Sequence, residues 1–259
     1  MKLQLFAHRG GMGRAPENTL TSFKQAYTDG ADAFECDVCL TQDKQPVLIH
    51  VDFNRNDIRI ATECTTPLNN MDWKEVQNLK VQNSDEPVAH LDDALRFVQE
   101  NQMPCFIEPK SDTPELLPII IERIHHFDVI HLVNILTFYI RKHILIDAKR
   151  LEPCLQTSAI FLNPMTNFLM AATTIDIKRV IFGWSKFNQF KLYNTITRSI
   201  PRQVDELRSN GFVVDAGFIL TSQDVAWAMQ NGIEGFWVDD VPIIKSTIER
   251  IKNKSVSKD

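Results

Sequence analysis

The chain has 259 residues, of which 44% are hydrophobic and 24% charged, and its formal net charge is −5. This length favours one globular domain, because an α/β barrel of about 250 residues is a single domain. A negative charge without a long basic run does not favour nucleic acid or anionic lipid as a partner. The N-terminal residues are too polar for a signal peptide, and no stretch approaches the ~20 apolar residues of a membrane span. We therefore expect a cytoplasmic protein without stable membrane insertion.

Strand-like apolar runs alternate with helix-like segments through most of the chain. The run 3–7 is followed by Leu20, Phe23 and Ala26 on one helical face, and that helix is expected to end at Gly30. Repeated β and α elements over this length favour a closed (β/α)8 TIM barrel, with a doubly wound sheet as the alternative. Further strands are predicted at 33–40, 47–50, 103–107, 133–138, 155–161, 179–183, 212–216 and 235–238. Further helices are predicted at 91–98, 115–126 and 222–230.

The segment from about 51 to 87 interrupts this alternation. It is rich in Asn, Asp and Thr, and only Trp73, Val76 and Leu79 have helical spacing. Because its ends would close on neighbouring strands, we expect residues 1–259 to form a single barrel domain with a small inserted subdomain at about 51–87. The segments 162–174 and 185–201 favour neither element type, and the tail 252–259 is predicted to be disordered.

Three carboxylates lie where the predicted strands end. Glu35 and Asp37 are two residues apart on one strand, so their side chains point the same way, and Glu108 follows another strand. Functional groups of α/β proteins gather at the carboxyl ends of parallel strands. Since Mg²⁺ and Ca²⁺ prefer oxygen ligands, these three residues are predicted to hold a divalent metal ion. The alternative is that Glu35 and Asp37 are ordinary polar residues on a half-exposed strand.

Two of the seven histidines, His8 and His50, each follow an apolar strand run and precede a loop. Two imidazoles that flank one substrate can divide acid and base catalysis, so both are predicted to be catalytic. Arg9 and Lys110 would place positive charge beside the same site, which suits an anionic substrate because guanidinium and ammonium groups bind phosphate. A structural ion pair between Lys110 and Glu108 is the alternative for the lysine.

Short motifs with these residues follow one another along the chain. They are His8-Arg9-Gly10, Pro16-Glu17-Asn18-Thr19, Glu35-Cys36-Asp37-Val38 with Thr41 and Asp43, His50, Glu108-Pro109-Lys110 and, more weakly, the stretch 232–242. In this ordered set the chain resembles the glycerophosphodiester phosphodiesterase family. The resemblance covers nearly the whole chain, although it is thin between Val129 and Asn210.

The resemblance implies a (β/α)8 barrel with a small insertion after the second histidine. It also implies hydrolysis of a small anionic phosphodiester, a glycerophosphodiester, to sn-glycerol 3-phosphate and an alcohol. The roles that it implies are an acid/base pair of His8 and His50, Mg²⁺ or Ca²⁺ ligands at Glu35, Asp37 and Glu108, and phosphate contacts at Arg9 and Lys110.

Three positions depart from the family's usual pattern. Val51 stands where Asp is usual, Gly217-Phe218-Ile219-Leu220 replaces Trp-Thr-Val-Asn, and Val238-Asp239-Asp240 replaces Thr-Asp before the final Pro. These departures leave two alternatives open. One is a phospholipase D-like cleavage of lysophospholipids, for which 161–172 could supply apolar loops. The other is a catalytically silent glycerophosphodiester-binding module, against which the presence of both histidines and all three carboxylates argues.

Overall fold

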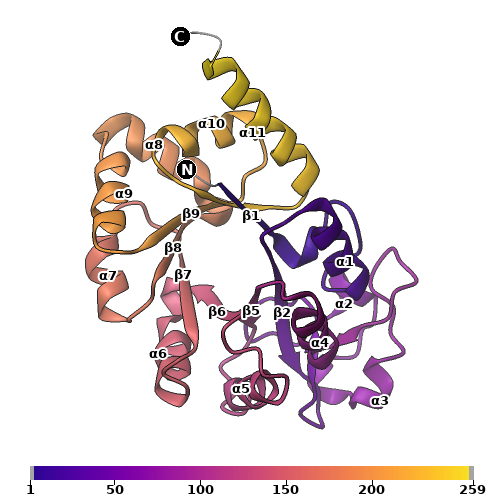
Figure 1. Cartoon of the computed structure of the whole chain (residues 1–259). Helices are drawn as coiled ribbons and strands as arrows, with labels where there is room; N and C mark the ends of the chain where they lie inside the picture. Colours follow the sequence, from indigo (N-terminus) through magenta and orange to yellow (C-terminus); the bar gives the residue numbers. More distant parts are fainter. Residues whose placement is uncertain (1–2, 257–259) are drawn as a thin grey trace.

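Eight parallel strands close into a barrel in the computed structural model, which describes residues 3–256 (Figure 1). The strand β1 pairs with both β2 and β10, and these two pairings close the barrel. The predicted TIM-barrel fold is therefore confirmed. The barrel strands are β1 (Gln4–Ala7), β2 (Ala33–Leu40), β5 (Cys105–Pro109), β6 (Val133–Phe138), β7 (Gln156–Phe161), β8 (Arg179–Gly183), β9 (Val213–Gly217) and β10 (Gly235–Val238).

Helices surround the barrel (Figure 1). The first of them, α1 (Leu20–Asp29), begins with a capping box in which Thr19 and Ser22 exchange side-chain and backbone hydrogen bonds, and it ends at Gly30, where φ is +79°. Its Phe23 stacks on Phe34 of β2 with 4.2 Å between ring centroids. The other covering helices are α4 (Leu91–Asn101), α5 (Leu116–His126), α6 (Lys142–Leu151), α7 (Phe168–Thr174), α8 (Phe187–Thr197), α9 (Ile200–Ser209), α10 (Ser222–Gln230) and α11 (Val241–Val256).

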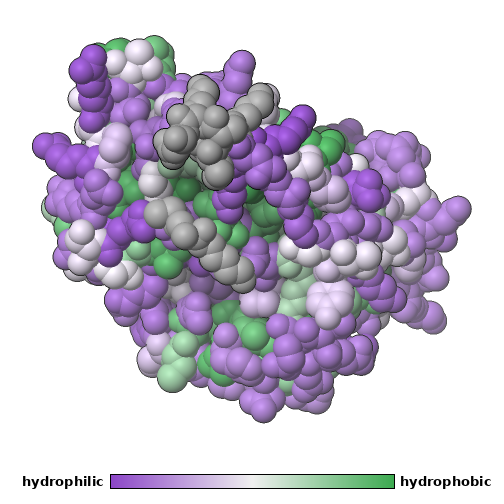
Figure 2. All heavy atoms as spheres, turned by 45° about the horizontal axis from the view of Figure 1, so that its top comes forward, coloured by the Kyte–Doolittle hydropathy of each residue, from purple (hydrophilic) through white to green (hydrophobic). Residues whose placement is uncertain are grey.

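The surface in Figure 2 is largely hydrophilic, and apolar side chains are visible mainly in recesses between polar ones. Among the described residues, no helix combines the length and the apolar character that a membrane span requires.

The C-terminal half contains helices that the sequence-based expectation did not include, among them α6, α9 and α11. The segments 162–174 and 185–201, which favoured no element, contain α7 and α8. The predicted disorder of 252–259 is wrong for residues 252–256, because α11 continues to Val256. Val241, Ile244 and Ile248 of this helix are buried in the core. Their spacing places them on one face, and burial of this apolar face stabilises the helix against the barrel. Residues 257–259 of the predicted tail lie outside the described part of the chain.

The chain between β2 and α4 forms a projection at one side of the barrel (Figure 1). Two short strands, β3 (Pro46–Leu48) and β4 (Ala89–His90), pair antiparallel with each other, and β3 also pairs antiparallel with β2. Between them lie α2 (Arg59–Thr62), η2 (Leu68–Asn70) and α3 (Trp73–Val76). An apolar cluster separate from the main core includes Val51, Ile58 and Leu68. Val51, which replaces a usual aspartate, is therefore a packing residue with 3% exposure.

An ion pair between a half-buried arginine and a fully buried aspartate links two neighbouring strands of the barrel. One guanidinium nitrogen of Arg179, on β8, donates hydrogen bonds of 2.8 and 2.6 Å to the two carboxylate oxygens of Asp215, on β9. Trp237 Nε1 donates a third bond of 3.2 Å to this carboxylate. A Cβ atom at Gly235 would lie 2.0 Å from Asp215 Oδ1, so only glycine leaves room for the pair.

We expect Asp215→Ala to lower the free energy of unfolding by about 1–3 kcal/mol, because the half-buried Arg179 would lose its counter-charge and Trp237 Nε1 its acceptor. Urea denaturation measures the change. The matched control is Asp147→Ala, which breaks an exposed pair with Arg150 and should cost less than about 1 kcal/mol. Equal losses in the two variants would contradict a special role for the buried pair.

Candidate active site

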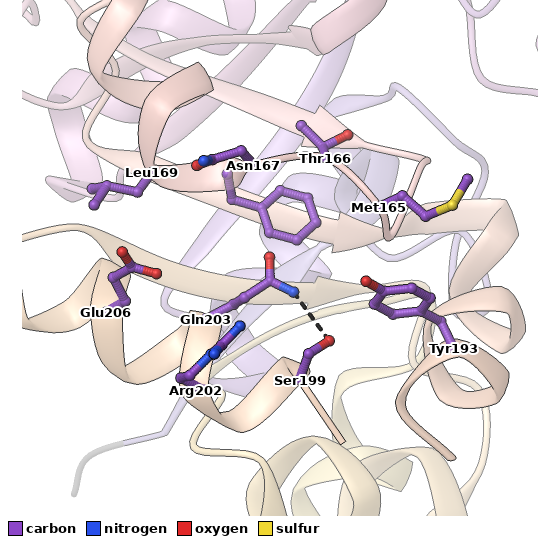
Figure 3. A pocket seen from close by; sticks show the side chains of 10 residues that line it. Met165, Thr166, Asn167, Leu169, Tyr193, Ser199, Arg202, Gln203 and Glu206 are labelled. Carbon is purple, nitrogen blue, oxygen red and sulfur yellow. Dashed lines mark hydrogen bonds between the residues drawn. The ribbon is translucent and has the colours of Figure 1, made fainter. Parts of the chain in front are cut away.

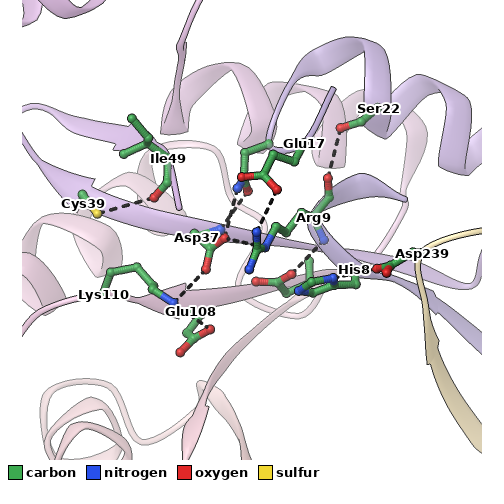
Figure 4. Close-up of polar contacts among 12 residues, drawn as sticks. His8, Arg9, Glu17, Ser22, Asp37, Cys39, Ile49, Glu108, Lys110 and Asp239 are labelled. Carbon is green, nitrogen blue, oxygen red and sulfur yellow. Dashed lines mark hydrogen bonds and ion pairs between the residues drawn. The ribbon is translucent and has the colours of Figure 1, made fainter. Parts of the chain in front are cut away.

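Three buried carboxylates, those of Glu35, Asp37 and Glu108, come together on β2 and β5. Figure 4 shows Asp37 and Glu108 with Lys110 between them. Glu35 and Asp37 share the inner face of β2, and Glu108 lies opposite Asp37 in the register of the two strands. One oxygen of each carboxylate lies within 4.8 Å of the others. Burial raises the pKa of Glu35 well above its ordinary value, and the charges of Asp37 and Glu108 add to this rise. The structure thus gathers the predicted metal ligands.

Two cations balance this charge. Lys110 Nζ lies 3.2 Å from Asp37 and 3.3 Å from Glu108, so the ion pair considered as an alternative exists and is part of the cluster. Arg9 Nε lies 3.3 Å from Asp37, while its Nη1 donates a 2.7 Å hydrogen bond to Glu17. Burial raises the pKa of Asp37, but Lys110 and Arg9 outweigh it and hold that pKa below its usual range. Asp37 is therefore the carboxylate most firmly kept ionised.

The His8-Arg9-Gly10 motif forms a tight turn, η1 (His8–Gly10), directly after β1. Arg9 has a φ of +49°, an uncommon conformation for a residue with a side chain. In this conformation its backbone N–H donates a 2.8 Å hydrogen bond to Glu35. Gly10 follows with a φ of +80°, and a Cβ atom there would lie 2.2 Å from Ser22 Oγ. The glycine therefore allows the turn to pass over α1 and to aim Arg9 into the site.

His8 is buried in the mouth of the barrel. Its Nδ1 lies 2.8 Å from Asp239 Oδ1, at the end of β10, and its ring packs edge-on against Phe218 at 4.4 Å between centroids. Burial lowers the pKa of His8 although Asp239 opposes the change. A proton on Nδ1 that is donated to Asp239 leaves Nε2 as the acceptor. Asp239 thus orients this imidazole.

His50 is placed in the site by an antiparallel strand, which the sequence pattern does not predict. The expectation that it follows a parallel barrel strand is wrong, because β3 runs antiparallel to β2. Ile49 N–H donates a 3.1 Å hydrogen bond to the backbone oxygen of Asp37, which fixes His50 beside the acidic cluster. Burial lowers the pKa of His50 to about 4, although the charge of Asp37 opposes this shift.

The sequence-based prediction misses two polar residues that hold the site together. Asn18 donates a 3.0 Å hydrogen bond to the Asp37 carboxylate and accepts another of 3.0 Å from the Asp37 backbone N–H. Asp239 is the partner of His8. Both lie in quoted motifs, and Asp239 also follows a predicted strand, which is the signal that could have identified it.

A separate pocket of about 230 Å³ lies between the loop before α7 and the helices α8 and α9 (Figure 3). Its wall includes Asn167, Tyr193 and Arg202, and Gln203 donates a 3.3 Å hydrogen bond to Ser199. It lacks a cluster of acidic or imidazole groups among its lining residues. This pocket is therefore a weaker candidate for catalysis than the barrel mouth.

The acidic cluster fits a divalent cation. Oxygen atoms are the ligands that hard cations prefer, and Glu35, Asp37 and Glu108 offer them at mutual distances within 4.8 Å. Glu108 Oε1 is buried and has no hydrogen-bond partner among the described residues. A buried acceptor without a partner is unfavourable, and a coordinated cation would satisfy it.

A sequence model of the Glycerophosphoryl diester phosphodiesterase family matches residues 8–242. The chain belongs to this family. The resemblance noted in the sequence is confirmed, and the protein is a phosphodiesterase by family.

A relative named glycerophosphodiester phosphodiesterase, from Caldanaerobacter subterraneus subsp. tengcongensis, is 24% identical over 93% of this chain and 95% of its own. Human glycerophosphodiester phosphodiesterase 1 is 30% identical over 42% of this chain and 34% of its own. Two solved structures share the fold of this family member. A phosphodiesterase from Oleispira antarctica in complex with the product sn-glycerol-3-phosphate has a TM-score of 0.80, with 22% identity over 95% of this chain and 96% of its own. A glycerophosphodiester phosphodiesterase from Agrobacterium tumefaciens has a TM-score of 0.75, with 17% identity over 93% and 98%.

The lowered pKa of His50 predicts how this phosphodiesterase responds to acid in the metal-free state. Between its ordinary pKa of 6.5 and a folded value of about 4, the unfolded chain binds the His50 proton and the folded chain does not. The His50 contribution to stability is therefore present above pH 6.5 and is lost as the pH falls towards 4. We expect urea denaturation to show a weaker loss of stability in this window for His50→Gln than for the wild type. Parallel pH curves would contradict the shift.

Proposed function

We propose that the protein hydrolyses glycerophosphodiesters to sn-glycerol 3-phosphate and an alcohol, with a divalent metal ion and an acid/base pair of His8 and His50. The observation that carries the proposal is the gathering of three buried carboxylates beside Arg9 and Lys110 in the barrel mouth. Family membership supports the reaction class. The product named for the Oleispira antarctica structure supports a glycerol phosphate product.

Glu35, Asp37 and Glu108 would hold the metal ion, which is Mg²⁺ or Ca²⁺ in this proposal because the donor set consists of carboxylate oxygens alone. When bound, such an ion supplies positive charge that stabilises the negative charge on the phosphoryl oxygens. Arg9 and Lys110 add two further positive charges next to Asp37. Their role is to bind the phosphate and to offset the charge that builds on it.

The two imidazoles carry the protons in this mechanism. A water attacks phosphorus, and one imidazole takes the proton of this water as the bond between phosphorus and the alcohol oxygen breaks. The other imidazole gives a proton to the leaving oxygen. If the glycerol hydroxyl of the substrate attacks instead, a cyclic phosphate forms, and a water must then open it to give sn-glycerol 3-phosphate. His8, held by Asp239 through Nδ1, has a free acceptor in its neutral form and suits the role of base. His50 is then the acid, and the negative charge of a bound phosphate raises its pKa towards the working pH.

Activity tests this assignment directly. The protein is incubated with glycerophosphocholine and Mg²⁺ or Ca²⁺, and release of sn-glycerol 3-phosphate is measured. His8→Asn and His50→Asn should each lower kcat by about 10²–10⁴-fold, because proton transfer contributes on that scale. His126→Asn is the matched control, since this histidine is exposed on α5, and its rate should equal that of the wild type.

Two outcomes would count against the mechanism. Release of product at the wild-type rate by both site variants would exclude the imidazole pair. No turnover of glycerophosphocholine or of lysophosphatidylcholine by the wild type would favour the binding module without catalysis.

Metal removal tests the carboxylate cluster. Exhaustive treatment with EDTA should abolish activity, and Mg²⁺ or Ca²⁺ should restore it. The melting temperature should also rise when the ion is added, because the ion binds the folded state and relieves repulsion among Glu35, Asp37 and Glu108. Glu108→Gln should remove most of this rise, whereas Glu122→Gln, an exposed substitution on α5, should leave it intact. Full activity after chelation would contradict the assignment.

A second candidate, cleavage of lysophospholipids, has one observation in its favour. An apolar pocket of about 460 Å³ opens where β6 and β7 end, with Phe138, Ile160 and Leu162 in its wall. Ile140, which also lines it, is 84% exposed. An acyl chain in this pocket would gain about 0.8 kcal/mol for each buried methylene group. Choline release from lysophosphatidylcholine that is faster than release from glycerophosphocholine would favour this candidate over the first.

A further inference from the structure

The barrel mouth contains a third cation, Arg141. Neither the sequence motifs nor the family comparison assigns a role to it. Arg141 ends η3 (Tyr139–Arg141), the turn that follows β6. This strand is the neighbour of β5, which carries Glu108. Arg141 Nη1 lies 3.6 Å from Glu108 Oε1, the buried oxygen without a hydrogen-bond partner among the described residues. The side chain is 25% exposed, so it is open to a ligand in the mouth.

Arg141 differs from the other two cations in how it is held. Lys110 and Arg9 contact carboxylates at 3.2 and 2.7 Å, and their side chains are only 6% and 17% exposed. The side-chain N–H groups of Arg141 make no hydrogen bond to any residue in the described part of the chain, and the nearest carboxylate oxygen lies 3.6 Å from its Nη1. A guanidinium group carries five N–H donors. Arg141, the most exposed of the three cations, therefore has donors available for an incoming anion.

An aromatic ring fixes the orientation of this guanidinium. Its Cζ lies 3.6 Å from the centroid of the Phe53 ring, in the loop directly after His50. Stacking on a ring face holds the guanidinium plane while its edge, which carries the N–H donors, stays free. Phe138, at the end of β6, lies further away at 5.5 Å. Phe53 is therefore the ring that orients the Arg141 side chain.

Asn54 connects the loop that contains Phe53 to the barrel through hydrogen bonds. It has a φ of +57°, which asparagine tolerates better than most residues. Its backbone N–H donates a 2.9 Å hydrogen bond to the backbone oxygen of Lys110. Its side chain and Asp112 exchange two more hydrogen bonds, both of 2.8 Å. Three bonds thus tie the loop that carries Phe53 to the end of β5.

We propose that Arg141 is a substrate-binding residue that donates hydrogen bonds to the phosphate oxygens of the diester, and that Phe53 is its positioning residue. The inference rests on the proposed function for the identity of the substrate. The competing explanation is that Arg141 only offsets the charge of Glu108. A separation of 3.6 Å, beyond hydrogen-bond range, and the free donors favour the substrate role.

The test compares Arg141→Met and Arg141→Lys with the wild type in saturating Mg²⁺. We expect Arg141→Met to raise KM for glycerophosphocholine by at least about tenfold, because a hydrogen bond to a charged group contributes on that scale. The inhibition constant of inorganic phosphate should rise in parallel. Both constants of Arg141→Lys should lie between those of the wild type and those of Arg141→Met. An ammonium group keeps the positive charge but lacks the paired N–H donors of a guanidinium. Phe53→Leu should raise KM by less than Arg141→Met.

Controls separate binding from folding. Arg150→Met, at the other end of α6, should leave KM and the phosphate inhibition constant unchanged. Melting temperatures show that each variant is folded, and calorimetry with inorganic phosphate measures binding without turnover. A normal KM and normal phosphate binding in folded Arg141→Met would overturn the inference while leaving the proposed function intact. Absence of wild-type turnover together with phosphate binding that depends on Arg141 would overturn the proposed function alone.

Discussion

The balance of charge in the barrel mouth is the constraint on which the rest of the site depends. Three carboxylates with nearly no exposure repel one another, and the barrel keeps them together only because cations from neighbouring elements lie among them. Arg9 enters from the turn after β1 and Lys110 from the end of β5. A divalent cation added to this arrangement would complete the neutralisation that the side chains begin. The same charge balance that allows the carboxylates to be buried thus also favours the binding of a cation.

Much of the site follows from strand geometry alone. The two-residue spacing of Glu35 and Asp37, and that of Glu108 and Lys110, places each pair on one face, and parallel pairing of β2 with β5 joins the pairs. This prediction succeeds because the side-chain period of a strand does not depend on tertiary context. The barrel likewise follows from alternating elements, whose strand positions at 133–138 and 179–183 agree with β6 and β8.

Other features depend on contacts that a linear pattern does not encode. An apolar run such as 47–50 has the same composition in a parallel or an antiparallel strand, so the route of His50 is decided only by the pairing of β3 with β2. Arg141 lies in a short turn without the hydrophobic periodicity of a strand or a helix. It contacts Phe53 because the fold brings together two loops that are distant in the sequence. The helices α7 and α8 were missed because exposed apolar residues such as Met170 and Leu192 obscure their amphipathic pattern.

The antiparallel strand that carries His50 has a consequence for how the molecule responds to heat. The hairpin of β3 and β4 lies outside the closed barrel; Leu48 and Ala89 pack into the main core, whereas Val47 and Ile49 belong to the smaller apolar cluster. Units of this kind open at a lower free energy than the global transition. Opening the hairpin would withdraw the His50 imidazole, whereas the loop of Phe53 is also tied to the end of β5 by the hydrogen bonds of Asn54. Inactivation can thus precede melting, and amide hydrogen exchange would resolve the two events in separate parts of the chain.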